Sequence, residues 1–341
     1  MASTHLAFYI ASTNMTKREF QKFVSFLMRE STVWASQKRG REVVLDKVTD
    51  SRQICLTSQL PLYSFKKLLV SCSEILFTSR GRRIIQERAD EKNQVILGLT
   101  IIDLRALVLL NQVFEKDPYY QERMNRTLVV GQSFVPRDRF QFFMRSYEED
   151  FLEHLQFDIF LGIQKEVHRG EKKNFKIFTG SLKGQRVLDE FGYKEYEHIQ
   201  FSGPIKEEGL NPEMIEIRNK MKYHHNPKIW EDLGKICIEC GKCSIVCPTC
   251  FCFDIKDKTD LKGGQRIREW SSCFYNEFSQ VGGGFKFLST TAKKIHNWYW
   301  HHFVRTPDEF SFPGCVGCGR CIRVCPAGID IREVIERIKK S

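Results

Sequence analysis

Two runs of closely spaced cysteines, both in the last third of the chain, restrict the possible folds more than any other feature. Both runs have the spacing C-x2-C-x2-C-x3-C-P. The first run contains Cys237, Cys240, Cys243 and Cys247, and the second contains Cys315, Cys318, Cys321 and Cys325. A segment with many cysteines and glycines and few core residues depends on bound metal for its order, as other small metal domains do. We therefore expect this region to fold around metal.

The spacing within each run indicates iron-sulfur clusters. Three thiolates two residues apart can surround one cubane cluster, whereas the fourth cysteine of a run cannot reach the same cubane. In two-cluster ferredoxins, this fourth cysteine ligates the other cluster. We therefore predict two 4Fe-4S clusters with crossed ligation. The first is assigned to Cys237, Cys240, Cys243 and Cys325, and the second to Cys315, Cys318, Cys321 and Cys247.

Other uses of cysteine explain the pattern less well. Zinc sites combine two C-x2-C pairs and rarely place three cysteines in one loop. A thioredoxin-like redox pair needs a single C-x2-C in a βαβ context, which is missing here. The chain has 13 cysteines, and its start lacks the basic and apolar segments of a secretory signal. We therefore expect a cytoplasmic protein with metal-bound thiols rather than disulfides.

The composition indicates a globular protein of more than one domain. The chain has 341 residues, of which 42% are hydrophobic and 28% charged, and this balance excludes extensive disorder. No apolar stretch reaches the roughly 18 residues that a membrane span needs. The formal net charge of +11 could attract nucleic acid, but the basic residues form no stripe. We expect no nucleic-acid partner and no transmembrane segment.

The first 220 residues alternate between helix and strand patterns. Thr16 and Glu19 form a capping box before an amphipathic helix, and Gly192 stands where a later helix would end. Strand patterns occur at 42–48, 94–100, 127–134, 157–163 and 175–179, and helix patterns at 103–114 and 182–191. We predict an α/β or α+β scaffold domain over residues 1–220. A mostly α-helical ferredoxin-like domain over 221–341 is expected to follow a polar helical connector at 211–234.

The two cysteine runs are separated by 67 residues, far more than in a small bacterial ferredoxin. We interpret this insert as a segment that packs against the clusters and can form a partner surface. Its aromatic stretch from His296 to His302 is either a docking hot spot or a buried helix face. Its histidines are not required as ligands, because eight cysteines already satisfy two clusters.

Five cysteines lie outside the two runs. Cys250, Cys252 and Cys273 could tune a cluster through hydrogen bonds, bind a third metal, or pack as small apolar residues. Cys55 and Cys72 are expected to have no role beyond packing or surface exposure.

The cysteine-rich region resembles a known family. The matching elements are Cys-Pro-Thr-Cys-Phe-Cys-Phe-Asp at 247–254, Arg-Ile-Arg-Glu-Trp-Ser-Ser-Cys at 266–273, Gly-Gly-Gly-Phe at 282–285 and Cys-Val-Gly-Cys-Gly-Arg-Cys at 315–321. They resemble the iron-sulfur β subunits of cytoplasmic NiFe hydrogenases of the sulfhydrogenase type, and equally the A subunit of anaerobic sulfite reductases. The resemblance implies an electron relay between a flavin subunit that handles NAD(P)H and a subunit with nickel-iron or sirohaem chemistry.

The chain departs from these relatives in its N-terminal part, where the family holds a further cluster. At the matching positions it has Ile102, Phe134, Phe140 and Phe142 in place of cysteines. Isoleucine and phenylalanine have no lone pair for iron, and close packing would fill the volume of the cluster with an apolar plug. We predict that the N-terminal domain carries no cluster and serves as a docking scaffold.

The sequence contains no nucleotide fingerprint and no acid-base or nucleophile constellation. We therefore expect that the chain is not an enzyme by itself and binds no NAD(P)H. Our interpretation is an electron-transfer subunit that connects a flavin/NAD(P)H-binding subunit with hydrogenase-type subunits. Two alternatives remain: the equivalent subunit of an anaerobic sulfite reductase or of a formate- or disulfide-linked complex, and a mainly structural iron-sulfur subunit. Nickel in the purified complex would support the hydrogenase-type subunit, and sirohaem would support the sulfite reductase subunit. Clusters that never change oxidation state during turnover would support the structural subunit.

Overall fold

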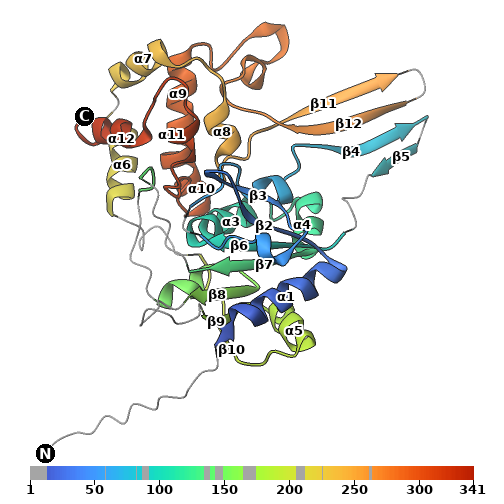
Figure 1. The fold of residues 1–341 in the computed structure, drawn as a ribbon. Coiled ribbons are helices and arrows are strands. Elements are labelled where there is room, and N and C mark those ends of the chain that lie inside the picture. Colours follow the sequence, from blue (N-terminus) through green and yellow to red (C-terminus); the bar gives the residue numbers. More distant parts are fainter. Residues whose placement is uncertain are drawn as a thin grey trace, which may run out of the picture.

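The computed structural model describes residues 14–57, 59–81, 83–86, 92–133, 139–142, 149–163, 174–204, 212–224, 226–260 and 263–341. Within these ranges, a large mixed sheet with helices precedes a region of helices that carries both cysteine runs (Figure 1). The predicted fold class is therefore confirmed. Among the described helices, none is long and apolar enough to cross a membrane.

The large sheet has eight described strands in the order β1-β9-β8-β7-β6-β2-β3, with β10 beside β9. The strands are β1 (Met15–Thr16), β2 (Thr32–Arg39), β3 (Glu42–Lys47), β6 (Gln94–Thr100), β7 (Thr127–Gln132), β8 (Ile159–Ile163), β9 (Asn174–Thr179) and β10 (Tyr196–His198). The central strands β2, β6, β7 and β8 are parallel. Strands β6 and β7 are almost entirely buried, as parallel strands covered on both faces usually are. All five predicted strand patterns correspond to strands of this sheet.

Helices α1 (Lys17–Glu30) and α5 (Leu182–Phe191) cover one face of the sheet (Figure 1). The predicted capping box is confirmed, because the Glu19 N–H donates to Thr16 Oγ1 at 3.3 Å and Glu19 Oε2 accepts from the Thr16 N–H at 2.8 Å. Phe20, Phe23 and Leu27 form the buried side of α1. The predicted end of α5 is confirmed at Gly192, whose φ of +84° is left-handed.

Helices α3 (Ile101–Val113) and α4 (Pro118–Asn125) lie on the other face of the sheet, toward the cysteine region (Figure 1). Helix α3 is apolar on nearly all sides, which is typical of a helix buried between two layers. Leu104 and Leu107 of α3 share one hydrophobic core with Val316, which belongs to the second cysteine run. The N-terminal part therefore packs directly against one cysteine loop.

A second, four-stranded antiparallel sheet projects from the body as an arm (Figure 1). Its strands are β11 (Phe253–Asp260), β12 (Gly263–Trp270), β4 (Ser73–Arg80) and β5 (Arg83–Gln86), in that order. The sequence did not predict the β11–β12 hairpin. Strand β11 is mostly charged and exposed, so its residues do not alternate between apolar and polar as those of a half-buried strand do. This sheet joins residues from both sides of the predicted division at residue 220, and that division stays a prediction.

The remaining helices surround the cysteine runs. They are α6 (Pro212–Tyr223), α7 (Pro227–Ile236), α8 (Lys242–Val246), α9 (Thr291–Trp300), a π-helical turn (His301–Arg305), α10 (Thr306–Phe310), α11 (Arg320–Val324) and α12 (Ile331–Lys339), and the short α2 (Lys66–Leu69) lies near the arm. Helices α6 and α7 occupy the predicted polar connector. In the aromatic stretch, Trp298, Tyr299 and His302 are buried, whereas His296 and Trp300 are half-buried and line a groove. Three of the seven residues of this stretch therefore form a buried helix face, and the other four are half-buried.

Candidate metal centre

The two cysteine runs fold in the same way. In each run, a glycine with left-handed backbone precedes a short helix: Gly241 (φ +68°) before α8, and Gly319 (φ +70°) before α11. Each helix ends at the fourth cysteine of its run, Cys247 or Cys325, in extended backbone. Helices α8 and α11 pack against each other. This pairing brings the end of each run close to the other run.

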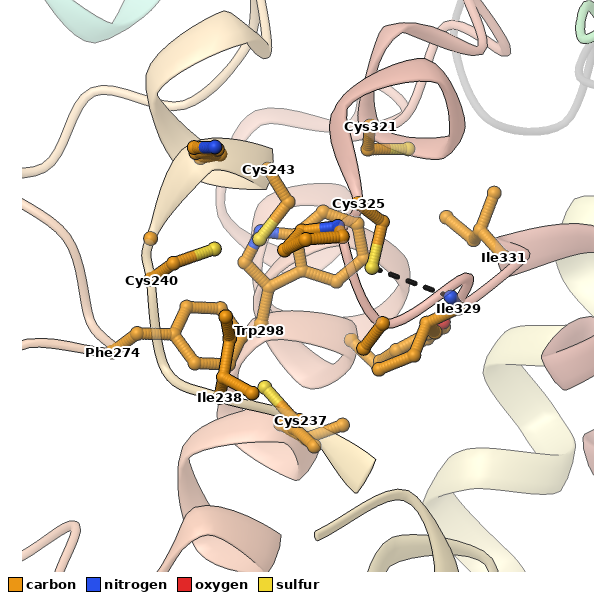
Figure 2. Close-up of a pocket in the computed structure, with 16 residues that line it drawn as sticks. Cys237, Ile238, Cys240, Cys243, Phe274, Trp298, Cys321, Cys325, Ile329 and Ile331 are labelled. Carbon is orange, nitrogen blue, oxygen red and sulfur yellow. Dashed lines mark hydrogen bonds between the residues drawn. The ribbon is translucent and has the colours of Figure 1, made fainter. Parts of the chain in front are cut away.

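The first predicted set of ligands lines one cavity (Figure 2). Its cysteines are Cys237, Cys240, Cys243 and Cys325, and Cys321 also contributes to the wall. The remaining wall is largely apolar, with Phe274 and Trp298 labelled in the figure. The Glu239 N–H donates to Cys237 Sγ at 3.4 Å, and the Ile329 N–H donates to Cys325 Sγ at 3.3 Å. Amide donors toward cysteine sulfur are typical of iron-sulfur sites, so these residues fit a 4Fe-4S cluster.

The second predicted set of ligands is linked by electrostatic influence. Burial raises the pKa of the thiols of Cys315, Cys318 and Cys321, and the charge of a Cys247 thiolate acts on each of them in the same direction. Cys247, from the first run, is therefore near enough to affect all three cysteines of the second run. The assignment of these eight residues as ligands stays a prediction.

The run at residues 237–247 is called the first loop below, and the run at residues 315–325 the second loop. A buried ion pair joins the second loop to the N-terminal part. Arg320 is fully buried, and its two terminal nitrogens donate to the two carboxylate oxygens of Asp103 at 2.7 and 3.0 Å. Its third donor, Nε, binds the carbonyl of Pro61 at 2.8 Å. Asp103 lies in the first turn of α3, where its charge also favours the helix N-terminus. Sequence reasoning missed this pair, and its only signal was a buried-type apolar helix that carries an aspartate in its first turn.

Equivalent positions of the two loops differ strongly in exposure. Ile238 follows the first cysteine of its run and is 65% exposed, whereas the equivalent Val316 is 3% exposed. Lys242 is exposed, whereas the equivalent Arg320 is buried. The first loop therefore faces solvent, and the second loop faces the interior.

Three of the four residues predicted to replace an N-terminal cluster are described, and they lie near the second loop. Ile102 is buried in the hydrophobic core that includes Val316. Phe142 packs against the helices of the cysteine region, and its N–H donates to the Gly317 carbonyl at 3.1 Å. The backbone of Phe140 lies against Gly319, and Phe134 is outside the described residues. The absence of an N-terminal cluster stays a prediction.

The contact at Gly319 leads to a first test. A Cβ at this position would lie 2.4 Å from the Phe140 carbonyl oxygen, and the φ of +70° already disfavours a side chain. We expect Gly319→Ala to lower the free energy of unfolding by at least about 2 kcal/mol, measured by anaerobic chemical unfolding. Gly40→Ala is the control, because Gly40 has a φ of +61° and no atom within 4 Å of such a Cβ. Equal losses in the two variants would contradict the close contact.

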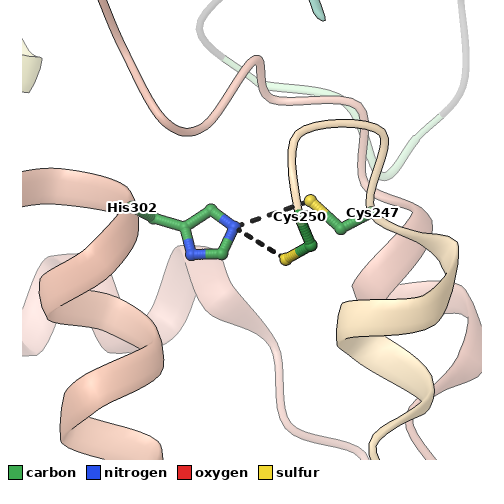
Figure 3. Close-up of side chains that lie close together, drawn as sticks. All are labelled: Cys247, Cys250 and His302. Atoms are coloured by element: carbon green, nitrogen blue, oxygen red, sulfur yellow. Dashed lines mark hydrogen bonds between the residues drawn. The ribbon is translucent and has the colours of Figure 1, made fainter. Parts of the chain in front are cut away.

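The cysteines outside the two runs have different surroundings. Cys250 and Cys273 are buried, Cys252 and Cys55 are half-buried, and Cys72 is exposed. A hydrogen bond from Cys273 lowers the pKa of Cys252 to about 7. Cys250 lies beside Cys247 and His302 (Figure 3). Sequence reasoning did not connect His302 with these cysteines, because more than 50 residues separate them in the chain.

Comparisons with known proteins agree with this geometry. Residues 236–329 match the family described as a 4Fe-4S dicluster domain. The chain is 26% identical over 344 residues to "Sulfhydrogenase 2 subunit beta" of Pyrococcus furiosus, which covers 94% of this chain and 96% of that protein. It is 29% identical over 122 residues to a Synechocystis protein named "Putative pyruvate-flavodoxin oxidoreductase", covering 35% of this chain and 8% of that protein. The predicted resemblance to hydrogenase β subunits and the presence of 4Fe-4S chemistry are thereby confirmed.

Proposed function

We propose that this relative of the hydrogenase β subunits is the electron-transfer subunit of a multi-subunit oxidoreductase. In this proposal, two 4Fe-4S clusters relay electrons between a flavin subunit that handles NAD(P)H and a hydrogenase-type catalytic subunit. The similarity to a sulfhydrogenase subunit over nearly the whole chain favours a hydrogenase-type partner. The main support for crossed ligation is the cavity lined by Cys237, Cys240 and Cys243 of one run and Cys325 of the other.

The residues around each group suit fast one-electron transfer, which is the chemistry that 4Fe-4S clusters supply. Phe274 and Trp298 exclude water from the first site, and the amides of Glu239 and Ile329 fix two of its sulfur atoms. The ion pair of Arg320 with Asp103 holds the second loop against α3. Such a packed environment limits the movement of the protein when a cluster gains or loses an electron.

The exposed first loop is the expected contact point for one redox partner. Ile238 is the exposed apolar residue nearest in sequence to two ligands, Cys237 and Cys240. Lys242 adds an exposed positive charge to the same loop. A partner with acidic groups around an apolar centre would fit this loop, because opposite charges guide association and apolar contact stabilises it. The buried second loop would then pass electrons within the complex.

The experiment that tests this function isolates the native complex through an affinity tag on the chain. We expect flavin and nickel in the complex, and NAD(P)H-dependent reduction of the clusters. Ile238→Glu should slow this reduction at least tenfold, because a buried charge at the interface costs more than about 1.4 kcal/mol. Ile84→Glu is the matched control, because Ile84 is also exposed, at 73%, but lies on the arm.

Other results would change the proposal. Sirohaem in place of nickel would assign the chain to a sulfite reductase. Clusters that keep one oxidation state throughout turnover would show a structural role instead. Equal rates in the wild type and in Ile238→Glu would move the partner contact away from the first loop without affecting the relay itself.

A further inference from the structure

Cys250, a cysteine that neither proposed cluster uses, lies in the interior beside His302 and Cys247. The exposed fractions are 5% for Cys250, 3% for His302 and 8% for Cys247. One ligand atom of each residue lies within 4.8 Å of the other two. In Figure 3, the edge of the His302 ring points between the two sulfur atoms. These three side chains offer two thiols and an imidazole, which are the preferred ligands of several transition metals.

The hydrogen bond on the far side of the His302 ring determines its tautomer. Nδ1 lies 2.7 Å from the carbonyl oxygen of Trp298, which can only accept, so Nδ1 carries the proton. In the neutral ring, Nε2 then presents a lone pair toward the two sulfur atoms. A second-shell carbonyl that orients a histidine in this way is typical of metal ligands.

The distances also match a metal site. His302 Nε2 lies 3.5 Å from both Cys247 Sγ and Cys250 Sγ. In a tetrahedral site with metal–sulfur and metal–nitrogen bonds of about 2.3 and 2.0 Å, the ligand atoms S and N are about 3.5 Å apart. Both nitrogen–sulfur distances therefore already have the value that an ion between these atoms would require.

The backbone around the three residues is specialised. His302 lies in the π-helical turn His301–Arg305, a rare conformation that is frequent at functional sites. The Thr249 hydroxyl donates to the Gly314 carbonyl at 2.7 Å and contacts Cys247 Sγ at 3.1 Å. These contacts hold the Cys247–Cys250 loop opposite the histidine.

A buried lysine fixes the backbone of the loop that carries Cys250. Lys66 is 4% exposed, and its Nζ donates to the carbonyls of Cys250 at 3.0 Å and Ser244 at 3.4 Å. Its Nζ also lies 4.4 Å from the centre of the Trp270 ring, so a cation–π contact accompanies these hydrogen bonds. Burial lowers the pKa of Lys66, and negative charge on Cys250 or Cys247 would oppose this effect. Lys66 therefore anchors the backbone at Cys250.

We propose that Cys250, His302 and Cys247 bind one divalent transition metal ion of the Zn²⁺ or Fe²⁺ class. Binding replaces the thiol proton of Cys250, and also that of Cys247 where no cluster already holds it; these protons are released to solvent, and no oxidation or reduction occurs. Because Cys247 is also the proposed fourth ligand of the second cluster, its thiolate would bridge the ion and that cluster. The bridge rests on the proposed function, because it requires the second cluster. Binding of the ion to these three residues does not require that cluster.

The test is a metal count on the full-length chain. The protein is reconstituted anaerobically with iron, sulfide and zinc, desalted, and analysed by mass spectrometry for all transition metals. We expect about eight irons and about one further metal ion per chain in the wild type. Cys250→Ser and His302→Gln should each lose that one ion and keep eight irons. His301→Gln and Cys72→Ser are the matched controls, and both should keep the full metal content.

Three results would overturn the proposal. The wild type could contain no metal beyond the cluster iron, or the additional ion could persist in both Cys250→Ser and His302→Gln. Loss of about four irons from both variants would instead make these residues supports of the second cluster. If either variant fails to fold, zinc-edge X-ray absorption of the wild type decides, with two sulfur neighbours and one nitrogen neighbour as the expected result.

Discussion

Replacing Cys325 with alanine is expected to lower the iron content of the purified chain from about eight to about four atoms. The lost cluster should be the one held by the first run, because Cys325 lines the same cavity as Cys237, Cys240 and Cys243. The measurement is iron per chain after anaerobic purification, together with the spin-resonance spectrum of the reduced protein.

Double variants decide between crossed ligation and ligation within each run. Cys325→Ala combined with Cys240→Ala should lose no more iron than either single variant, because both residues would serve one cluster. Cys325→Ala combined with Cys318→Ala should lose all of the iron. Cys72→Ser is the control, since Cys72 is exposed and outside both groups. The reverse pattern in the two double variants would contradict crossed ligation.

Replacing Asp103 with alanine is expected to lower the free energy of unfolding by about 3–5 kcal/mol. The substitution leaves the buried guanidinium of Arg320 without its negative partner, and the cost of an unpaired buried charge is high. Anaerobic chemical unfolding followed by circular dichroism measures this loss. The loop that carries Cys318 and Cys321 should loosen at the same time, which should lower the iron content.

Two further variants isolate the ion pair as the cause. Asp308→Ala breaks two surface pairs, with Lys222 and with Arg218, and should cost at most about 2 kcal/mol. Asp103→Leu combined with Arg320→Met removes both charges and should recover most of the stability, because apolar residues of similar volume can replace a buried ion pair. If Asp103→Ala costs no more than Asp308→Ala, the pair does not hold the loop.

The parts of the fold that local pattern determines could be predicted from the sequence. The buried strands β6 and β7 are continuous apolar runs, and the limits of α1 and α5 follow from a capping box and a left-handed glycine. The spacing of the cysteines predicted a 4Fe-4S region, because a repeated short-range motif leaves few ways to arrange its ligands, and the family match over residues 236–329 confirms that region.

The missed features depend on contacts between residues far apart in the chain. The pairing of Arg320 with Asp103 and the position of His302 beside Cys250 result from tertiary packing, which leaves no periodic signal in the sequence. The difference between the two loops is of the same kind. Ile238 and Val316 occupy equivalent motif positions and are both apolar, so only the packing of α3 against the second loop separates an exposed residue from a buried one.

The arm has a consequence for how the chain is synthesised. Strand β4 pairs on one side with β5, which follows at once, and on the other side with β12, which the ribosome produces much later. Until then, β4 presents an unpaired edge that can associate with other chains. The edge closes only when β12 has been synthesised and has paired with β4. We therefore expect chains truncated before β12 to aggregate more than the full-length chain, measured as the fraction that sediments after expression.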